Sequence, residues 1–444
     1  MAKSSEPLTE AETTLSFKRA FLVSLPILLS NATYPLVGLV DSWVLGRLDS
    51  PQILAAVALA VSLVWIIFGS FNFLRYVTGG QIAQAFGAKN DQLIKEILLR
   101  SALAALVISL IIILASFFLT PLMAALVTKD HQIRAYIEIY LQIRIYAMPA
   151  TLLNMVIIAA FVGLGQTRTV FILQLVLNIA NIAMSLYFVQ VLKWGVFGVA
   201  LGTALAEFLS LLLGVALLLR NLGSFKGAVQ ALKSWGAFKL QAIQGMDMLL
   251  RTAVLELVYL SFFKTSGEFS TVGLAINAIL LHFHSISAYA MDSFAFTLES
   301  YAGRAIGAKS KPLFYSAIYK CTVLAVIFAL VLALLFWFFG DDFVSMMSVN
   351  EQIRQNASGF VKIAALLPLV CVASFMLDGL FFGATMTRAL NIGMLLSALG
   401  YYLITLVFVP QAGVHGLWIA LMGFFILRAL TLLFYVPQMM RKYF

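Results

Sequence analysis

Charged residues are scarce in this 444-residue sequence. Asp, Glu, Lys and Arg make up 11% of the chain, whereas a soluble globular protein carries roughly 25%. Hydrophobic residues reach 62%, and the mean hydropathy is +1.00. So few charges cannot cover a water-exposed surface of this size. The composition therefore excludes a soluble enzyme or binding domain and indicates an integral membrane protein.

Cysteine is also scarce, and no catalytic constellation is apparent. Cys321 and Cys371 lie inside apolar segments, where such residues are typical of packing rather than of a disulfide or metal pair. The net charge is +10, but the basic residues stand singly between apolar runs, which does not favour nucleic acid as a partner. We therefore expect no enzymatic activity, no cofactor and no metal.

Twelve long apolar segments dominate the chain. A helix needs about 20 apolar residues to cross a bilayer, and segments of this order lie near 17–46, 53–80, 93–118, 134–163, 168–192, 196–220, 238–264, 271–303, 313–339, 356–384, 388–409 and 414–437. The sequence predicts an all-α membrane protein with twelve transmembrane helices. We expect an N-terminal tail (1–16), an N-lobe (17–220), a linker (221–237) and a C-lobe (238–444).

Short motifs recur about 220 residues apart. Residues 305–309 (Ala-Ile-Gly-Ala-Lys) repeat residues 85–89 (Ala-Phe-Gly-Ala-Lys), a separation of 308 − 88 = 220. Gly163 likewise precedes Arg168 as Gly383 precedes Arg388. This pattern predicts two six-helix lobes that form a parallel repeat around a central cleft, an architecture typical of alternating-access transporters.

Lys and Arg are distributed unevenly over the connecting segments. Most of them fall on the side that holds both termini, and few fall on the other side. Since positive charges mark the cytoplasmic side of a membrane protein, we expect both termini to be cytoplasmic. The predicted location is a bacterial inner membrane.

Asp41 is the strongest candidate for chemistry, because an ionisable group within a span is costly and is a functional candidate by default. Asn31, Tyr34, Gly38 and Asp41 advance by three or four residues and so share one helix face. Pro26 removes a backbone hydrogen bond earlier in the same helix and permits a kink. Because desolvation disfavours the charged form of a carboxyl group, this combination predicts a proton-driven switch. A solvated acid near the end of the span is the alternative.

Further small polar residues fall inside the N-lobe spans. Taken singly, each is typical of interhelical packing, but together they would form a substrate pocket. The residues that we expect to support the site are Tyr34, Asn154, Asn178, Asn181, Ser185 and Thr203.

The C-lobe contains its own acidic residues. The candidates for a cation or drug site are Glu256, Asp292 and Asp378. Glu299 follows Asp292 by two helical turns, and we expect it to be solvated near the end of its span. A pair of carboxylates could bind Na⁺. A buried ion pair with Arg251 or Arg144 is the alternative, and the sequence leaves both open.

Several motifs resemble the multidrug and toxic compound extrusion (MATE) family. They include residues 35–41 (Pro-Leu-Val-Gly-Leu-Val-Asp) and 81–90 (Gln-Ile-Ala-Gln-Ala-Phe-Gly-Ala-Lys-Asn). Residues 290–296 (Ala-Met-Asp-Ser-Phe-Ala-Phe) and 377–384 (Leu-Asp-Gly-Leu-Phe-Phe-Gly-Ala) are similar to its DinF-like branch. The resemblance covers essentially the whole chain. It implies secondary active multidrug efflux, in which amphiphilic cations are exported in exchange for H⁺ or Na⁺.

The resemblance also implies roles for individual residues. It matches the family's first-span acid to Asp41, its fifth-span asparagine to Asn181 and its second-lobe cation site to Glu256 and Asp378. Ser185 stands where many members of that branch carry an aspartate, which leaves more of the coupling to Asp41. We expect a monomer in the lipid bilayer with H⁺ as the coupling ion, and Na⁺ as the alternative.

A lipid-linked sugar flippase of the same superfamily is a further alternative. Its anionic substrate would favour a cavity rich in Arg and Lys. The mid-span charges of this sequence are expected to be mainly acidic, which favours a cationic substrate instead.

Overall fold

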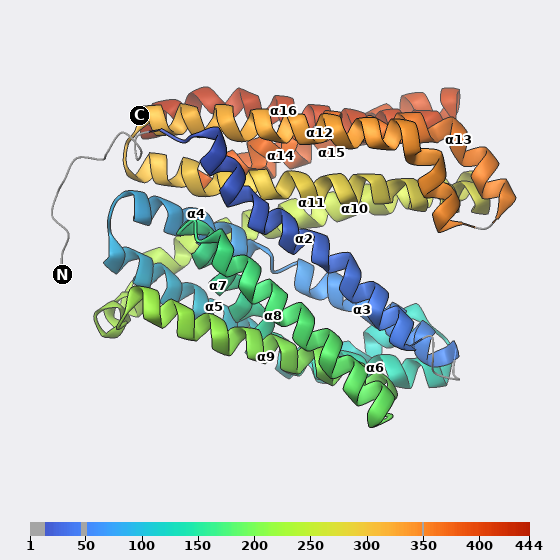
Figure 1. The fold of residues 1–444 in the computed structure, drawn as a ribbon, viewed down its shortest axis with the longest axis horizontal. Helices are drawn as coiled ribbons and strands as arrows, with labels where there is room; N and C mark the ends of the chain where they lie inside the picture. Colours follow the sequence, from blue (N-terminus) through green and yellow to red (C-terminus); the bar gives the residue numbers. More distant parts are fainter. Residues whose placement is uncertain (1–13, 46–50, 349) are drawn as a thin grey trace. The chain divides into compact units, whose positions relative to one another are not determined.

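A computed structural model of the chain describes residues 14–45, 51–348 and 350–444, except for the side chains of residues 34–45, 51, 230, 231 and 233. Within these ranges the chain is helical and contains no β-strand (Figure 1). The predicted all-α class is confirmed.

The helices follow the predicted spans closely. The first part of the chain forms α2 (Phe17–Leu45), α3 (Pro51–Gly69), α4 (Phe73–Gly87), α5 (Asp91–Val127), α6 (His131–Tyr146), α7 (Met148–Gly163), α8 (Thr167–Leu186), the π-helix η1 (Tyr187–Val191), α9 (Gly195–Leu222) and the 3₁₀-helix η2 (Lys226–Lys233). The second part forms α10 (Trp235–Phe269), α11 (Thr271–Gly307), α12 (Lys311–Met347), α13 (Glu351–Ala365), α14 (Leu367–Gly383), α15 (Thr387–Ala412) and α16 (Val414–Tyr443).

Three predicted spans are each covered by two consecutive helices, namely α3 with α4, α6 with α7, and α13 with α14. Grouped in this way, the helices correspond to the twelve predicted spans, six before η2 and six after it. Within the described residues, nine helical segments are long and apolar enough to cross a membrane, or ten if the pair α6 and α7, bent by 50°, counts as one span.

The internal repeat is visible in the backbone. Helix α12 begins and ends 220 residues after α5. The turns that precede these two helices place Lys89 (φ 53°) and Lys309 (φ 52°) in the left-handed region, which residues with a side chain rarely adopt. Asn90 and Ser310, the next residues, each accept a hydrogen bond from the first turn of the following helix. Two such unusual turns at equivalent positions confirm the predicted duplication.

The helices form two compact units. The N-unit is Leu29–Ala242, and the C-unit combines Ile243–Phe444 with the chain up to Leu28. The boundary thus falls within α2, whereas the predicted N-lobe was 17–220. Ser24 Oγ is hydrogen-bonded to Thr297 Oγ1 at 2.8 Å, and this contact holds the start of α2 on α11 of the C-unit.

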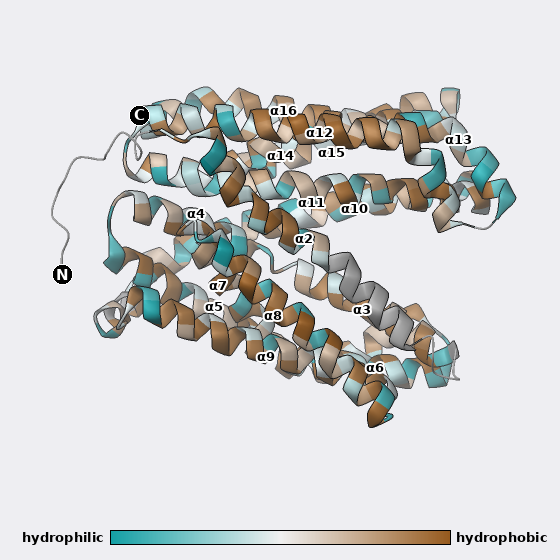
Figure 2. Ribbon diagram, viewed as in Figure 1, coloured by the Kyte–Doolittle hydropathy of each residue, from teal (hydrophilic) through white to brown (hydrophobic). Residues whose placement is uncertain are grey.

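Large apolar side chains are exposed along the helices. On α5, Leu114, Phe117 and Phe118 are 70%, 78% and 74% exposed. Figure 2 shows that hydrophobic residues dominate the helices, while hydrophilic residues gather toward several helix ends. Apolar surface on this scale is not stable in water, so it indicates that lipid surrounds the helices.

Glycine allows α14 to approach α11 closely. A Cβ atom added at Gly379 would overlap the backbone carbonyl of Ala295, and one added at Gly383 would overlap that of Glu299. The equivalent contact in the N-unit joins Gly163 of α7 to Gly79 of α4, where an added Cβ would lie 2.7 Å from the carbonyl oxygen. Both units therefore bring two helices together at a glycine.

We expect Gly379→Ala to destabilise the C-unit by about 1–3 kcal/mol, because the α11 and α14 backbones would have to separate. Gly359→Ala is the matched control, since nothing lies within 4 Å of its added Cβ. Alanine in that helix should stabilise it by roughly 0.5–1 kcal/mol. The apparent melting temperature of the purified protein measures both effects. Equal melting of the two variants would contradict this account of the contact.

Candidate functional site

Polar side chains from three helices meet in the N-unit. Asn178 Nδ2 on α8 donates a hydrogen bond to Thr33 Oγ1 on α2 at 2.5 Å. Asn181 Nδ2, one turn later, donates to Thr203 Oγ1 on α9 at 2.7 Å. Gln174 Nε2 donates to Asn178 Oδ1 at 3.2 Å. We call these five residues, together with Ser185, the N-unit polar cluster.

The cluster follows from the spacing of polar residues on α8. Gln174, Asn178, Asn181 and Ser185 advance by three or four residues, so that they share one helix face, and all four are buried. Gly202 brings α9 close to this face, because a Cβ atom there would lie 3.0 Å from the backbone nitrogen of Ser185. This approach places the side chain that follows Gly202 within reach of Asn181.

Two polar atoms of the cluster have unused hydrogen-bonding capacity. Asn181 Oδ1 and Ser185 Oγ are buried and have no hydrogen-bond partner among the residues whose side chains the structure describes. Buried polar atoms are nearly always hydrogen-bonded in folded proteins. These two atoms are therefore suited to a polar ligand group, a water molecule or a proton carrier.

The remaining predicted residues of the first span lie in α2. Pro26 is half-buried and stands close to the boundary between the two units. The backbone of Asp41 and Tyr34 belongs to the same continuous helix, but their side chains lie outside the described residues. The roles of Asp41 and Tyr34 accordingly stay predictions.

Asn154 takes part in a different arrangement from the one predicted. Its Nδ2 atom donates to the backbone oxygen of Glu207 at 2.8 Å, and it forms no described hydrogen bond with the cluster on α8. The Glu207 side chain pairs with Arg144 at 2.7 Å and also accepts a hydrogen bond from Thr151 Oγ1 at 2.5 Å. Both members of the ion pair are buried, so Asn154 supports a buried charge pair.

Asp378 of the C-unit also lies in a buried charge cluster. Its Oδ2 atom accepts hydrogen bonds from Arg251 and from Arg428, and all three side chains are buried. Of the two alternatives for this carboxylate, the structure shows an ion pair with Arg251. A carboxylate that faces two guanidinium groups has no surplus negative charge for a further cation.

The other C-lobe acids differ in exposure. Glu256 is exposed, and Asp292 is half-buried and close enough to Arg428 to interact with its charge. Glu299 was expected to be solvated, but it is fully buried, because α14 packs against its backbone through Gly383. Within the described chain, no group of three or more His, Cys, Asp or Glu side chains could hold a metal ion.

The expectation that mid-span charges are mainly acidic is wrong for the described residues. The buried charged side chains are Arg75, Arg100, Arg144, Arg251, Arg428, Glu207, Glu299 and Asp378. Sequence reasoning did not single out Arg75 or Arg428. A single arginine in the middle of an apolar span is a signal that could have identified both, since such a charge requires a partner.

Comparison with known proteins places this fold in a family. The model of the MatE family matches residues 26–187 and again residues 248–410, so it recognises each half of the repeat. The chain belongs to the MatE family. The predicted resemblance to MATE transporters is confirmed.

Relatives of the MatE protein extend over nearly its whole length. DNA damage-inducible protein F of Escherichia coli (strain K12) is 33% identical over 426 residues, which cover 94% of this chain and 92% of that protein. Multidrug and toxin extrusion protein 1 of Homo sapiens is 24% identical over 438 residues, which cover 95% of this chain and 73% of that protein. The first similarity confirms the DinF-like branch.

Solved structures confirm the two-lobe fold. An outward-facing multidrug resistance MATE transporter of the MOP superfamily superposes with a TM-score of 0.85 at 17% sequence identity, covering 96% of this chain and 97% of that one. The MatE protein is thus a multi-pass membrane transporter of the multidrug efflux family rather than an enzyme.

Proposed function

We propose that the protein exports amphiphilic cationic compounds across a bacterial inner membrane in exchange for H⁺, with Asp41 as the proton-coupling group. The observation that supports this proposal is the N-unit polar cluster. It gathers Thr33, Asn178, Asn181 and Thr203 beside the helix that carries Asp41 and leaves buried polar atoms available to a ligand.

The attachment of α2 supports a mechanical role for this helix. Its first part is held in the C-unit by the contact between Ser24 and Thr297, and its second part is held in the N-unit by the contact between Thr33 and Asn178. Pro26, between the two contacts, lacks the backbone N–H that would stiffen the helix. Protonation of Asp41 would bend α2 near Pro26, shrink the N-unit pocket and release the substrate.

Competition for one charge explains the exchange. A deprotonated Asp41 attracts a cationic substrate, and protonation removes that attraction. Binding of the proton and binding of the substrate are then mutually unfavourable, which couples the two by linkage. The proton would enter from the outer side and leave toward the cytoplasm, where the two termini are placed by the distribution of Lys and Arg.

The two alternatives receive less support. Na⁺ coupling through Glu256 and Asp378 requires a carboxylate that is available to a cation, but Asp378 is paired with two arginines. A flippase for an anionic lipid-linked sugar requires cationic side chains that are available to its substrate. The buried Arg144, Arg251 and Arg428 are all engaged by carboxylates.

The decisive test is efflux of a fluorescent cationic dye from proteoliposomes under separate H⁺ and Na⁺ gradients. We expect an imposed pH gradient to drive efflux by the wild-type protein, and Asp41→Asn to reduce this efflux to the level of empty vesicles. Asp130→Asn is the control, since Asp130 is a helix N-cap and asparagine caps a helix equally well. Wild-type efflux by Asp41→Asn under the pH gradient, or efflux driven by Na⁺ alone, would refute the proposal.

A further inference from the structure

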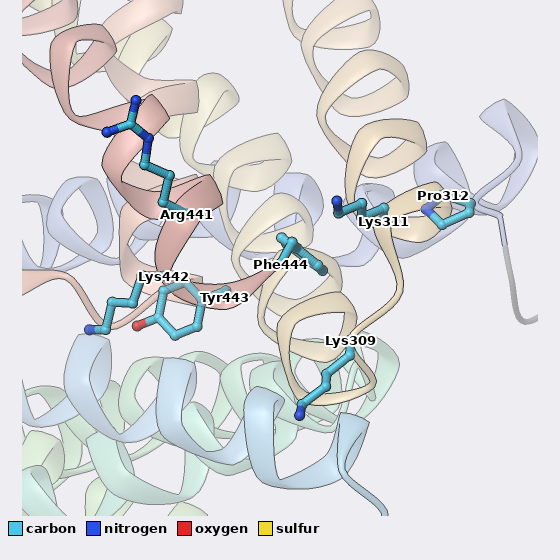
Figure 3. Close-up of a pocket in the computed structure, with 7 residues that line it drawn as sticks. All are labelled: Lys309, Lys311, Pro312, Arg441, Lys442, Tyr443 and Phe444. Atoms are coloured by element: carbon cyan, nitrogen blue, oxygen red, sulfur yellow. The ribbon is translucent and has the colours of Figure 1, made fainter.

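A basic pocket lies at one end of the C-unit. It has a volume of about 520 Å³ and is lined by Lys309, Lys311, Pro312, Arg441, Lys442, Tyr443 and Phe444. Figure 3 shows that the turn between α11 and α12 supplies the first three residues and that the end of α16 supplies the others. Two segments that are far apart in the sequence thus form one pocket, which the transport mechanism does not use.

Positive charge dominates the pocket. Four of its seven lining residues are cationic and none is acidic. None of the four forms an ion pair with a carboxylate among the described residues. A carboxylate at Phe444 would still leave an excess of three positive charges. The pocket also lies at the N-terminal end of α12, where the helix dipole favours an anion.

The walls of the pocket are held in place by other parts of the C-unit. Tyr443 Oη donates a hydrogen bond to the carbonyl of Ala384 at 2.7 Å, and the Phe444 ring packs against Phe314 with centroids 5.1 Å apart. The backbone N–H of Lys309 donates to Ile306 at 3.1 Å, which fixes the turn. An anion would therefore enter a largely preformed site.

The equivalent place in the N-unit lacks this charge. Lys309 and Lys311 correspond to Lys89 and Asp91 at the repeat distance of 220 residues, so the two positive charges become one of each sign. Arg441 and Lys442 lie in α16, whose counterpart α9 is followed by the linker helix η2. Gly227 of η2 lies against Gln92 there, with 3.6 Å between its added Cβ and the amide oxygen. The basic pocket is a feature of one lobe and not a consequence of the shared fold.

We propose that this pocket binds the phosphate group of an anionic membrane lipid. Several lysines and arginines at a membrane interface recognise anionic headgroups. From Lys311, exposed side chains continue along α12 at spacings of four or seven residues: Tyr315 (57%), Tyr319 (61%), Val326 (41%) and Leu330 (48%). These positions form one stripe along the helix. Two interfacial tyrosines followed by apolar residues suit a lipid chain, whereas free phosphate would use only the pocket.

The test compares lipid binding by charge variants of the full-length protein. Lys311→Gln/Arg441→Gln/Lys442→Gln removes three charges from the pocket. The control Lys89→Gln/Arg220→Gln/Lys239→Gln removes three exposed charges elsewhere. Each protein is titrated with short-chain phosphatidylglycerol, phosphatidylcholine or inorganic phosphate, and bound ligand is counted by native mass spectrometry. We expect the pocket variant to bind phosphatidylglycerol on the order of 100-fold more weakly, and the control to bind it as the wild type does.

Three outcomes would overturn the proposal: equal losses in the pocket and control variants, equally tight binding of phosphatidylcholine, or binding of inorganic phosphate as tight as that of the lipid. The last outcome would identify free phosphate as the ligand. Lys311→Asp provides a second variant if the triple variant does not fold, because aspartate is already the residue at the equivalent position of the N-unit. It should weaken phosphatidylglycerol binding at least tenfold, and unchanged binding would contradict the proposal.

Discussion

Replacement of Asp378 by leucine is expected to reduce the free energy of unfolding by about 3–5 kcal/mol, the usual effect of removing one partner from a buried ion pair. Arg251 and Arg428 both donate to this carboxylate, and they are only 5% and 4% exposed. Without Asp378, two positive charges would face each other in a medium of low dielectric constant. Asp292, which lies near Arg428, would leave the two arginines with a single negative charge.

The apparent melting temperature of the detergent-purified protein measures this loss. Asp341→Leu is the matched control, since Asp341 is exposed near the end of α12 and should change stability by no more than about 0.5 kcal/mol. The same measurement distinguishes the ion pair from a Na⁺ site. A structural ion pair predicts equal melting of the wild type in NaCl and in choline chloride. A Na⁺ ligand predicts stabilisation by Na⁺ that disappears in the Asp378→Leu variant.

Much of the fold was predictable because the bilayer imposes a simple rule. An apolar segment of about 20 residues has to be helical to satisfy its own backbone in lipid, so the lengths of the apolar runs locate the helices. Several helices extend farther than predicted. Helix α5 continues to Val127 rather than to 118, since its last turns leave the most apolar region without a helix-breaking signal.

The boundary between the two units was not predictable from the same rule. Helix α2 is apolar on both sides of Leu28, and nothing in its local sequence indicates that its first part belongs to the C-unit. Only the partners of Ser24 and Thr33, which lie 273 and 145 residues farther along the chain, assign each part of the helix. A periodic pattern shows which face of a helix is polar, but it does not show what that face will contact.

The candidate site shows the same limit. The spacing of Asn178, Asn181 and Ser185 correctly predicted one polar face on α8. The same reasoning assigned Asn154 to that site, although its hydrogen bond goes to Glu207. A single polar residue on a neighbouring helix has no periodicity, so that its partner depends on the rotation of the helix in the folded unit.

The two units retained their packing while their chemistry diverged. Gly163 and Gly383 make equivalent close contacts, and the backbone positions that they face are Gly79 in one unit and Glu299 in the other. The contact involves backbone atoms, so it tolerates a change from glycine to a buried glutamate on the facing helix. Close packing between helices requires the small residue on one side only, which leaves the facing position free to acquire a different side chain.

Removal of Glu207 from the N-unit should be as damaging as the loss of Asp378, but it should be reversible by a second substitution. Glu207→Leu leaves Arg144 buried without its carboxylate, for an expected loss of about 3–5 kcal/mol. Arg144→Met/Glu207→Leu removes both charges together. Buried ion pairs replaced by apolar residues of similar volume are often neutral or stabilising, so the double variant should recover most of the lost stability in melting experiments.

Efflux by the double variant then separates structure from transport. If the pair only supports the fold, the double variant should export dye at the wild-type rate, because the N-unit polar cluster has no described hydrogen bond to either charged side chain of the pair. A variant that melts as the wild type does but fails to export would instead show that Glu207 or Arg144 takes part in transport. Since Thr151 Oγ1 also donates to Glu207, Thr151→Val should accompany the double variant as a control for the hydroxyl group that it leaves unpaired.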